Sequence, residues 1–389
     1  MKNNSKKLRM LKSQVQGITL IALVVTVIVL LILAGVAINL TVGDNGLFKR
    51  AQNAADTWQM AEQNEQLAMD EATDFLGWYS ENTATTVKDA IQQNSPYRSD
   101  TTITDDLDNE IKIPAGFKIA SDSATKVEDG IVIEDKDGNQ FVWIPVSTDE
   151  HPTIHTSLGE KIINYVRIDF HLGSQFSDYI ESLPADEEAS VNKNGGYYIG
   201  RFESGDKEAT ENKTMRSEEK DATITIRKGQ VPYNYITQQN SETKAKEMAG
   251  VQGYSTAMTK LVSSYAWDTA INFIEIKNEK YGSELLLGNY YNIALNYIDL
   301  NGIEQTKGAD ESYLIPTGQT TAVSNIYDMG GNLYEYTTEK SINGTYPCVS
   351  RGGGFGMIDN YPAGNRGFNS GKSTKYHGFR VALYLKVIE

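Results

Sequence analysis

The most uneven feature of the chain is one long apolar run near its start. No charged residue occurs between positions 13 and 43, and residues 18–40 read ITLIALVVTVIVLLILAGVAINL. A helix rises about 1.5 Å per residue, so about 20 apolar residues are enough to cross the hydrocarbon core of a membrane. A buried helix of a globular protein rarely reaches this length without a polar face. The pattern therefore predicts a transmembrane helix over residues 18–42.

A second pattern follows the turn formed by residues 43–46, which read GDNG. Apolar side chains then recur in alternating steps of four and three, with only Glu65 breaking the stripe: Leu47, Ala51, Ala54, Trp58, Ala61, Ala68, Ala72, Phe75 and Tyr79. This spacing is typical of one face of an amphipathic helix. We expect a stalk helix over residues 43–80. It would pack on its own head domain or on a neighbouring subunit, and the spacing does not distinguish the two.

The rest of the chain alternates short apolar runs with turn residues. Residues 81–110 are polar and are interpreted as a linker or a loosely packed collar, with one short helical candidate, Val87–Gln93. Residues 131–135 and 140–146 flank the turn KDGN and predict a hairpin. A strand is expected at 197–202, helices at 241–248 and 263–276, and short glycine-rich strands from 325 on. The fold class that we predict is α+β, with residues 111–389 as one ectodomain.

The distribution of charge along the chain predicts which end of it faces the cytoplasm. The formal net charge of the 389 residues is −15. The first 17 residues form a basic leader with five cations and no acid, so the remainder carries −20. Such an acidic domain is repelled by nucleic acid. A basic cluster before an apolar run predicts a cytoplasmic N-terminus. We therefore expect a single-pass protein of the cell membrane, with its C-terminal head extracellular.

The junction between leader and apolar run carries a processing signal. The leader ends in Gly17, and the run begins with Ile18 and the residues TLI. This junction resembles the type IV prepilin signal. The resemblance implies that a prepilin peptidase cleaves after Gly17, that the new N-terminal Ile18 is methylated, and that other pilin-like subunits are partners. The family usually has glutamate at the fifth mature position, where this chain has Ala22, which leaves filament assembly open.

Five segments of the ectodomain occur in a distinctive order: residues 196–203 (GYYIGRFE), 266–268 (AWD), 325–337 (NIYDMGGNLYEYT), 350–355 (SRGGGF) and 377–380 (HGFR). Together they resemble the formylglycine-generating (sulfatase-modifying) enzyme superfamily. The resemblance implies that residues 111–389 form an elaborated C-type lectin-like domain.

The catalytic residues of that superfamily do not carry over. Its copper site needs two cysteines after the Arg-Gly-Gly motif, whereas this chain has only Cys348, which precedes it. Cys348 is expected to be a buried, inert thiol. An iron-dependent branch needs a set of histidines, and the four present are interpreted as solvated loop residues: His151, His155, His171 and His377. We therefore predict a protein that is not an enzyme and has no cofactor.

Ligand binding is the function that remains. Loops displayed on a rigid base are where recognition usually occurs, and aromatic and amide side chains suit contact with a glycan or a protein. The segment 355–376 offers ten candidates, about half of which we expect to be exposed: Phe355, Met357, Asp359, Asn360, Tyr361, Asn365, Phe368, Asn369, Lys372 and Tyr376. Some members of the superfamily diversify this region through a retroelement, and the Asn, Tyr and Ser content here is compatible with that.

One metal site is implied by the resemblance. Asn332 and Glu335 match a stretch that lies near bound calcium in some members, and both offer oxygen ligands. The alternative is that Asn332 shapes a turn and Glu335 bonds to backbone. The function predicted from the sequence is thus a membrane-anchored, pilin-like surface binding protein, an adhesin or ligand-display module. The alternatives are a minor pilin or pseudopilin subunit and a metal-dependent oxidase-like enzyme.

Overall fold

The computed structural model describes residues 24–33, 49, 54–55, 57–62, 65, 69, 82–172, 175–209, 215–357 and 361–387. The chain divides into two compact units, residues 1–75 and 76–389. Each unit is treated by itself below. The leader 1–17, with Gly17, and the following residue Ile18 lie outside the described residues.

The predicted transmembrane helix is the first correction. Within the range 18–42 the structure describes residues 24–33, which are helical. No helix among the described residues is long and apolar enough to cross a membrane. The predicted fold class is therefore wrong in its membrane-spanning helix, and the predicted single-pass membrane localisation is not supported.

The described residues of the range 43–80 are all helical: 49, 54–55, 57–62, 65 and 69. Trp58, on the stripe expected to be the packing face, is 78% exposed.

The C-terminal unit is a mixed α/β structure built on a six-stranded antiparallel sheet in the order β13-β20-β9-β5-β4-β3. The strands are β3 (Lys118–Ile119), β4 (Val132–Glu134), β5 (Gln140–Pro145), β9 (Gly196–Gly200), β13 (Ala257–Leu261) and β20 (Val381–Leu385). Every residue of β9 and β20 is buried. Strands buried on both faces read as continuous apolar runs rather than as alternating ones, and this explains the sequences YYI and VALYL.

Four α-helices of this unit are α3 (Val87–Gln93), α4 (Ala185–Asn194), α5 (Gln238–Gln252) and α6 (Ser264–Ile274). The hydroxyls of Thr237 and Ser263 cap α5 and α6 by accepting hydrogen bonds from the backbone N–H groups of Asn240 and Ala266. Helix α4 contacts β9 and β20, and α6 contacts β5. The central sheet is thereby covered, and Trp143, Tyr197 and Trp267 lie fully buried in its core.

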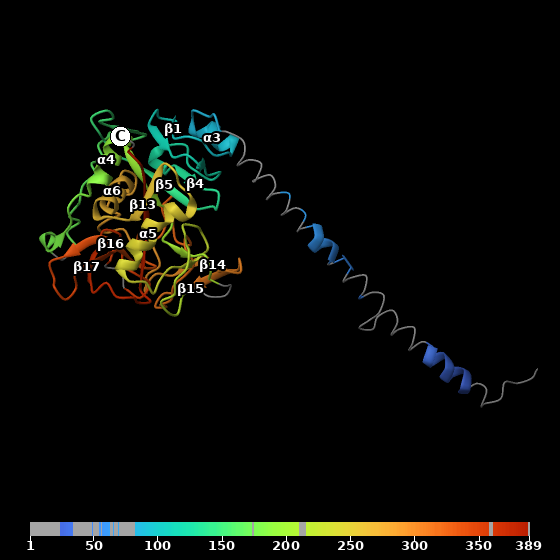
Figure 1. Ribbon diagram of the computed structural model, residues 1–389. Coiled ribbons are helices and arrows are strands. Elements are labelled where there is room, and N and C mark those ends of the chain that lie inside the picture. Colours follow the sequence, from blue (N-terminus) through green and yellow to red (C-terminus); the bar gives the residue numbers. More distant parts are fainter. Residues whose placement is uncertain are drawn as a thin grey trace, which may run out of the picture. The chain divides into compact units, whose positions relative to one another are not determined.

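A second sheet carries the C-terminal part of the chain. Its order is β18-β17-β16-β19, with β8 also pairing with β16. The strands are β8 (Tyr179–Ile180), β16 (Tyr334–Ser341), β17 (Cys348–Arg351), β18 (Arg366–Asn369) and β19 (His377–Phe379). Strand β19 runs parallel to β16, whereas the other pairs are antiparallel. Figure 1 shows β16 and β17 at the opposite end of this unit from α3 and β1.

Short two- and three-stranded sheets and two 3-10 turns complete the described part of this unit. The strands are β1 (Thr101–Thr104), β2 (Glu110–Ile113), β6 (Ile154–Thr156), β7 (Gly159–Lys161), β10 (Gly205–Asp206), β11 (Ile224–Thr225), β12 (Val231–Pro232), β14 (Leu295–Ile298) and β15 (Glu304–Lys307). The turns are η1 (Val127–Asp129) and η2 (Phe176–Asp178).

The segment expected to be a linker belongs to the packed unit instead. Residues 82–110 contribute α3 and β1, and Val87, Tyr97 and Ile103 are buried in the main core. Tyr97 also donates a hydrogen bond through its hydroxyl to the Ala84 carbonyl, at 2.9 Å. Single apolar residues spaced far apart in a polar stretch leave no periodic signal, although each fills a place in the core.

Candidate ligand-binding site

The segment 355–376 lies between two strands of the second sheet and contains a third. It follows β17, contains β18, and leads into β19. Arg351 of β17 pairs with Arg366 of β18, and Gly378 of β19 pairs with Glu335 of β16. The exposed side chains of the segment are therefore carried by a backbone that the sheet holds at several points.

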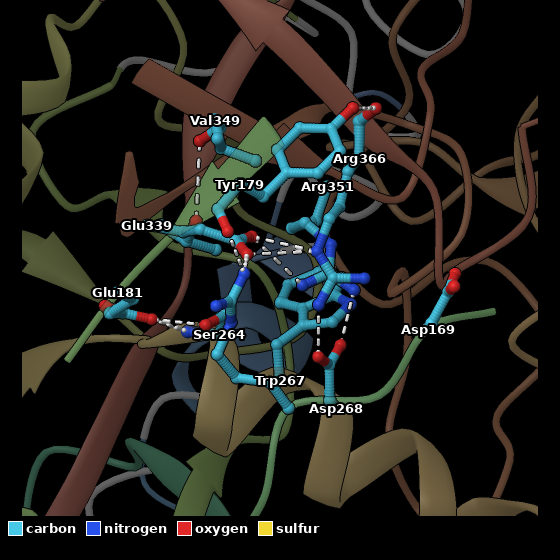
Figure 2. Close-up of polar contacts among 12 residues, drawn as sticks. Asp169, Tyr179, Glu181, Ser264, Trp267, Asp268, Glu339, Val349, Arg351 and Arg366 are labelled. Carbon is cyan, nitrogen blue, oxygen red and sulfur yellow. Dashed lines mark hydrogen bonds and ion pairs between the residues drawn. The ribbon is translucent and has the colours of Figure 1, made fainter. Parts of the chain in front are cut away.

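The first anchor of the segment is a buried cluster of ion pairs, shown in Figure 2. Arg351 is fully buried, and its Nη2 lies 2.5 Å from Asp268 Oδ1. Arg366 donates to the other oxygen of Asp268, and its Nε lies 3.1 Å from both carboxylate oxygens of Glu339. Asp268 and Glu339 are fully buried. Asp268, on α6, thus joins the two strands that flank the first half of the segment.

A third arginine completes this cluster. Arg167 Nη2 lies 2.5 Å from Glu339 Oε1 and 2.8 Å from the Tyr179 carbonyl. Two further donors reach backbone carbonyls, with Arg351 Nε at 3.0 Å from Asn365 O and Arg366 Nη1 at 2.9 Å from Ile168 O. Arg167 Nε and Arg351 Nη1 are buried without a hydrogen-bond partner, and Arg351 Nη1 lies 3.7 Å from Glu339 Oε2. Burial and the neighbouring Arg366 lower the pKa of Arg351, against the opposing effect of the carboxylates. Buried charges are stable only when paired in this way.

The indole of Trp267 also holds the first half of the segment in place, through Ala363. Its Nε1 donates to the Ala363 carbonyl at 2.9 Å, and the Arg351 guanidinium lies 5.6 Å from the centre of its ring. Gly352 follows Arg351 with φ of +83°, and a Cβ there would lie 2.3 Å from the Met329 carbonyl oxygen. Only glycine fits this close approach.

The second anchor lies at the C-terminal end of the segment. Arg380 is fully buried and binds both oxygens of Glu335, through Nε at 2.9 Å and Nη2 at 2.6 Å. Its other donors reach the carbonyls of Gly200 and Tyr327, each at 2.8 Å. Burial raises the pKa of Glu335 to about 7, although Arg380 acts in the opposite direction. Because Arg380 binds both oxygens of Glu335, the pair fixes the position of the backbone at Arg380 relative to β16 and also neutralises the buried charge.

His377 connects the segment to the sheet between these anchors. Its ring stacks between those of Tyr334 and Tyr336, with centroids 5.5 and 4.9 Å away. Asn369 Oδ1 accepts from the Tyr336 hydroxyl at 3.0 Å, so Asn369 Nδ2 faces His377 Nε2 at 2.5 Å. Nε2 is then an acceptor, and Nδ1, 2.6 Å from Thr374 Oγ1, carries the proton. Burial lowers the pKa of His377 to about 4, so the expectation of a solvated histidine is wrong here.

The structure describes eight of the ten candidate side chains, and they lie in three environments. Phe368, Lys372 and Tyr376 are exposed. Met357, Tyr361 and Asn369 are half-buried, whereas Phe355 and Asn365 are buried. Asp359 and Asn360 lie outside the described residues.

The exposed aromatic rings lie on buried or partly buried partners. Tyr376 stacks on Phe355, with centroids 5.3 Å apart, and Phe368 stacks on Tyr179 at 4.8 Å. Phe355 belongs to a small second core with Leu314 and Leu333. Each exposed ring is therefore held by a ring beneath it, which lowers the conformational entropy that binding would remove.

The predicted calcium residues are engaged by other side chains. Both oxygens of Glu335 bind Arg380, so the expectation that Glu335 bonds to backbone is wrong. Asn332 has φ of +55°, as a turn-shaping residue would, and its Oδ1 accepts from Asn289 Nδ2 at 2.9 Å. Its Nδ2 donates to the Glu203 carboxylate. Burial raises the pKa of Glu203 well above its usual value. In the described part of the chain no group of three or more His, Cys, Asp or Glu side chains could hold a metal ion. Neither observation tests calcium binding, which stays a prediction.

The long-range contacts of this site have no local signal in the sequence. Asp268 of α6 and Glu339 of β16 lie 83 and 12 residues before Arg351 of β17 in the sequence. No local sequence spacing therefore indicates that these three side chains meet. Cys348 is buried next to the segment, where a Cβ on Gly371 would touch its sulfur. His151 lies 3.6 Å from Glu110, and the His171 side chain is 86% exposed.

Comparison with known proteins adds no functional assignment. No family model and no curated protein matches the chain. Among solved structures, a crystal structure of CarF matches 54% of this chain and 95% of its own, at 13% sequence identity and a TM-score of 0.33. The resemblances to prepilins and to formylglycine-generating enzymes therefore stay predictions.

Proposed function

We propose that the C-terminal unit is a non-catalytic ligand-binding module and that the segment 355–376 carries its binding surface. One observation carries the proposal: buried arginine–carboxylate pairs fix both ends of the segment, and Phe368, Lys372 and Tyr376 are exposed between them. Rigid support beneath exposed aromatic and cationic side chains is the arrangement expected of a recognition surface. The ligand would be a glycan or a protein at a cell surface, as for an adhesin or a ligand-display module.

The charges near the segment support binding over catalysis. Asp268, Glu339 and Glu335 each have both carboxylate oxygens bound to arginines. A general acid or base needs a proton-accepting atom within reach of its substrate. These side chains instead set the position of the backbone.

The test uses the fluorescently labelled full chain and intact bacterial and epithelial cells, with retention measured by flow cytometry. The double variant Phe368→Ser/Tyr376→Ser removes the two exposed rings and is expected to lower retention at least tenfold. Leu158→Ser/Ile162→Ser is the matched control, because it removes two apolar side chains that are 61% and 64% exposed outside the segment. Circular dichroism checks that both variants fold. Retention that is absent, or equal in the two variants, would contradict the proposal.

A further inference from the structure

A surface groove lies beside the C-terminal part of the segment. Its volume is about 370 Å³, within the range of about 300–1,000 Å³ typical of small-ligand sites. Three stretches of chain line it: the loop 219–221, residues 233–236, and the first turns of α5 with Asn240, Thr243, Lys244 and Glu247.

Hydrogen bonds join the groove directly to the segment. The backbone N–H of Tyr235 donates to the Thr374 carbonyl at 2.9 Å, and that of Gln238 donates to Gly371 at 3.1 Å. Asn234 Nδ2 lies 3.0 Å from the Lys375 carbonyl. One edge of the groove is therefore bonded to the residues that surround Lys372 and lead to Tyr376, so a ligand on the segment can extend into the groove.

Tyr235, which lines the groove, has an unfavourable backbone conformation. Its φ is +50°, in the left-handed region, where a bulky side chain is a genuine outlier. A non-glycine residue in this region is destabilised by about 1–2 kcal/mol. Asparagine or glycine would meet the same backbone requirement more easily, yet the position holds a half-buried aromatic ring that lines the groove. Strain of this kind is a recognised feature of binding sites.

The chemistry of the walls favours a neutral, hydroxyl-rich ligand. Lys244 lies 2.5 Å from Asp221, and Asn240 Nδ2 donates to Glu219 at 2.9 Å. The groove holds three carboxylates against two lysines, so it does not attract anions. Carboxylate, amide, hydroxyl and ammonium groups can each bond a sugar hydroxyl. The half-buried ring of Tyr235 can offer an apolar face to its C–H groups, whereas Tyr233 is 2% exposed and Arg216 covers its ring.

We infer that this groove is a saccharide-binding subsite that continues the surface of the segment 355–376, with Tyr235 as its stacking platform. The inference rests on the proposed function, since the segment supplies the rest of the surface. It adds to that function the class of ligand and a second element, the 233–247 stretch.

The experiment applies the full chain to an array of bacterial-surface and host oligosaccharides and then titrates the oligosaccharide that binds best. The variant Tyr235→Asn removes the ring, and asparagine tolerates the left-handed backbone. We expect its melting temperature to equal or exceed that of the parent and its affinity for the oligosaccharide to fall about tenfold. Tyr297→Asn, which removes a tyrosine of β14 outside the groove and the segment, should leave the affinity unchanged.

The outcomes separate the inference from the proposed function. If no oligosaccharide binds while cells still retain the chain through Phe368 and Tyr376, the subsite is refuted and the binding module stands. An affinity that survives Tyr235→Asn also refutes the subsite. If neither cells nor oligosaccharides bind, both proposals fail. A lower affinity in a variant that melts no earlier supports the subsite, because a merely structural tyrosine would not produce this combination.

Discussion

Removing Asp268 tests whether the buried ion cluster holds the candidate binding surface in place. Its carboxylate accepts from Arg351, from Arg366 and, at 2.9 Å, from the backbone N–H of Ile168. In Asp268→Ala, three guanidinium groups would remain with Glu339 as the one carboxylate of the cluster. Breaking a buried pair by deleting one partner costs about 3–5 kcal/mol, because the other charge stays buried and uncompensated. Since domains are stable by about 5–15 kcal/mol, this variant should lose a large part of its stability.

The measurement is urea-induced unfolding of the full chain, followed by the fluorescence of the buried Trp143 and Trp267 and by circular dichroism. The matched control is Asp186→Ala, which breaks an exposed pair with Lys260 and should cost about 1 kcal/mol or less. The double variant Asp268→Ala/Arg351→Met removes one uncompensated charge and should be more stable than the sum of the two single changes implies. Equal losses in Asp268→Ala and Asp186→Ala, or strict additivity in the double variant, would refute the reasoning.

Three further predictions concern single positions. The pKa of His377 is about 4 in the folded chain and about 6.5 in an unfolded one, so the unfolded state binds the extra proton between these values. Stability should therefore fall as the pH drops from about 6.5 to about 4, by at most about 3.4 kcal/mol; urea unfolding of His377→Gln should lack this component, and an identical pH slope would contradict it. Gly352→Ala should lower the melting temperature far more than Gly253→Ala, because both have positive φ but only the first Cβ meets a neighbour, at 2.3 Å from Met329 O; equal shifts would show that the contact relaxes. Cys348, the only thiol and 9% exposed, should react with Ellman's reagent slowly in the native chain and to one equivalent in urea; rapid native labelling would show that the loop over it opens.

The sequence predicts local structure well where the pattern is continuous. The hairpin at 131–146 appears as β4 and β5 in antiparallel register, and the short helix Val87–Gln93 has the bounds expected of it. Helix α5 is longer than the predicted 241–248, since its polar sequence has no apolar stripe and only the cap at Thr237 marks its true start. Terminal helix residues are the least predictable ones.

The candidate site was predictable only as a segment. Exposed aromatics in 355–376 could be inferred from composition, but the burial of Phe355 and Asn365 depends on partners elsewhere in the chain. The conformation of Tyr235 could not be predicted from the sequence, because a tyrosine between Asn234 and Ile236 gives no indication of a positive φ. Long-range pairing and local strain are set by the tertiary fold, which periodicity cannot express.

The two arginine anchors also determine how the segment responds to changes in its length. Arg351 is held by Asp268 of α6 and Arg380 by Glu335 of β16, and β18 pairs with β17 between them, so residues 370–376 leave and re-enter the second sheet at fixed points. For a flexible loop whose ends are already fixed, each doubling in length costs only about 0.6 kcal/mol. Between β18 and β19 the framework could therefore display loops of different length and composition in place of residues 370–376, which makes this turn a natural host for grafted peptides.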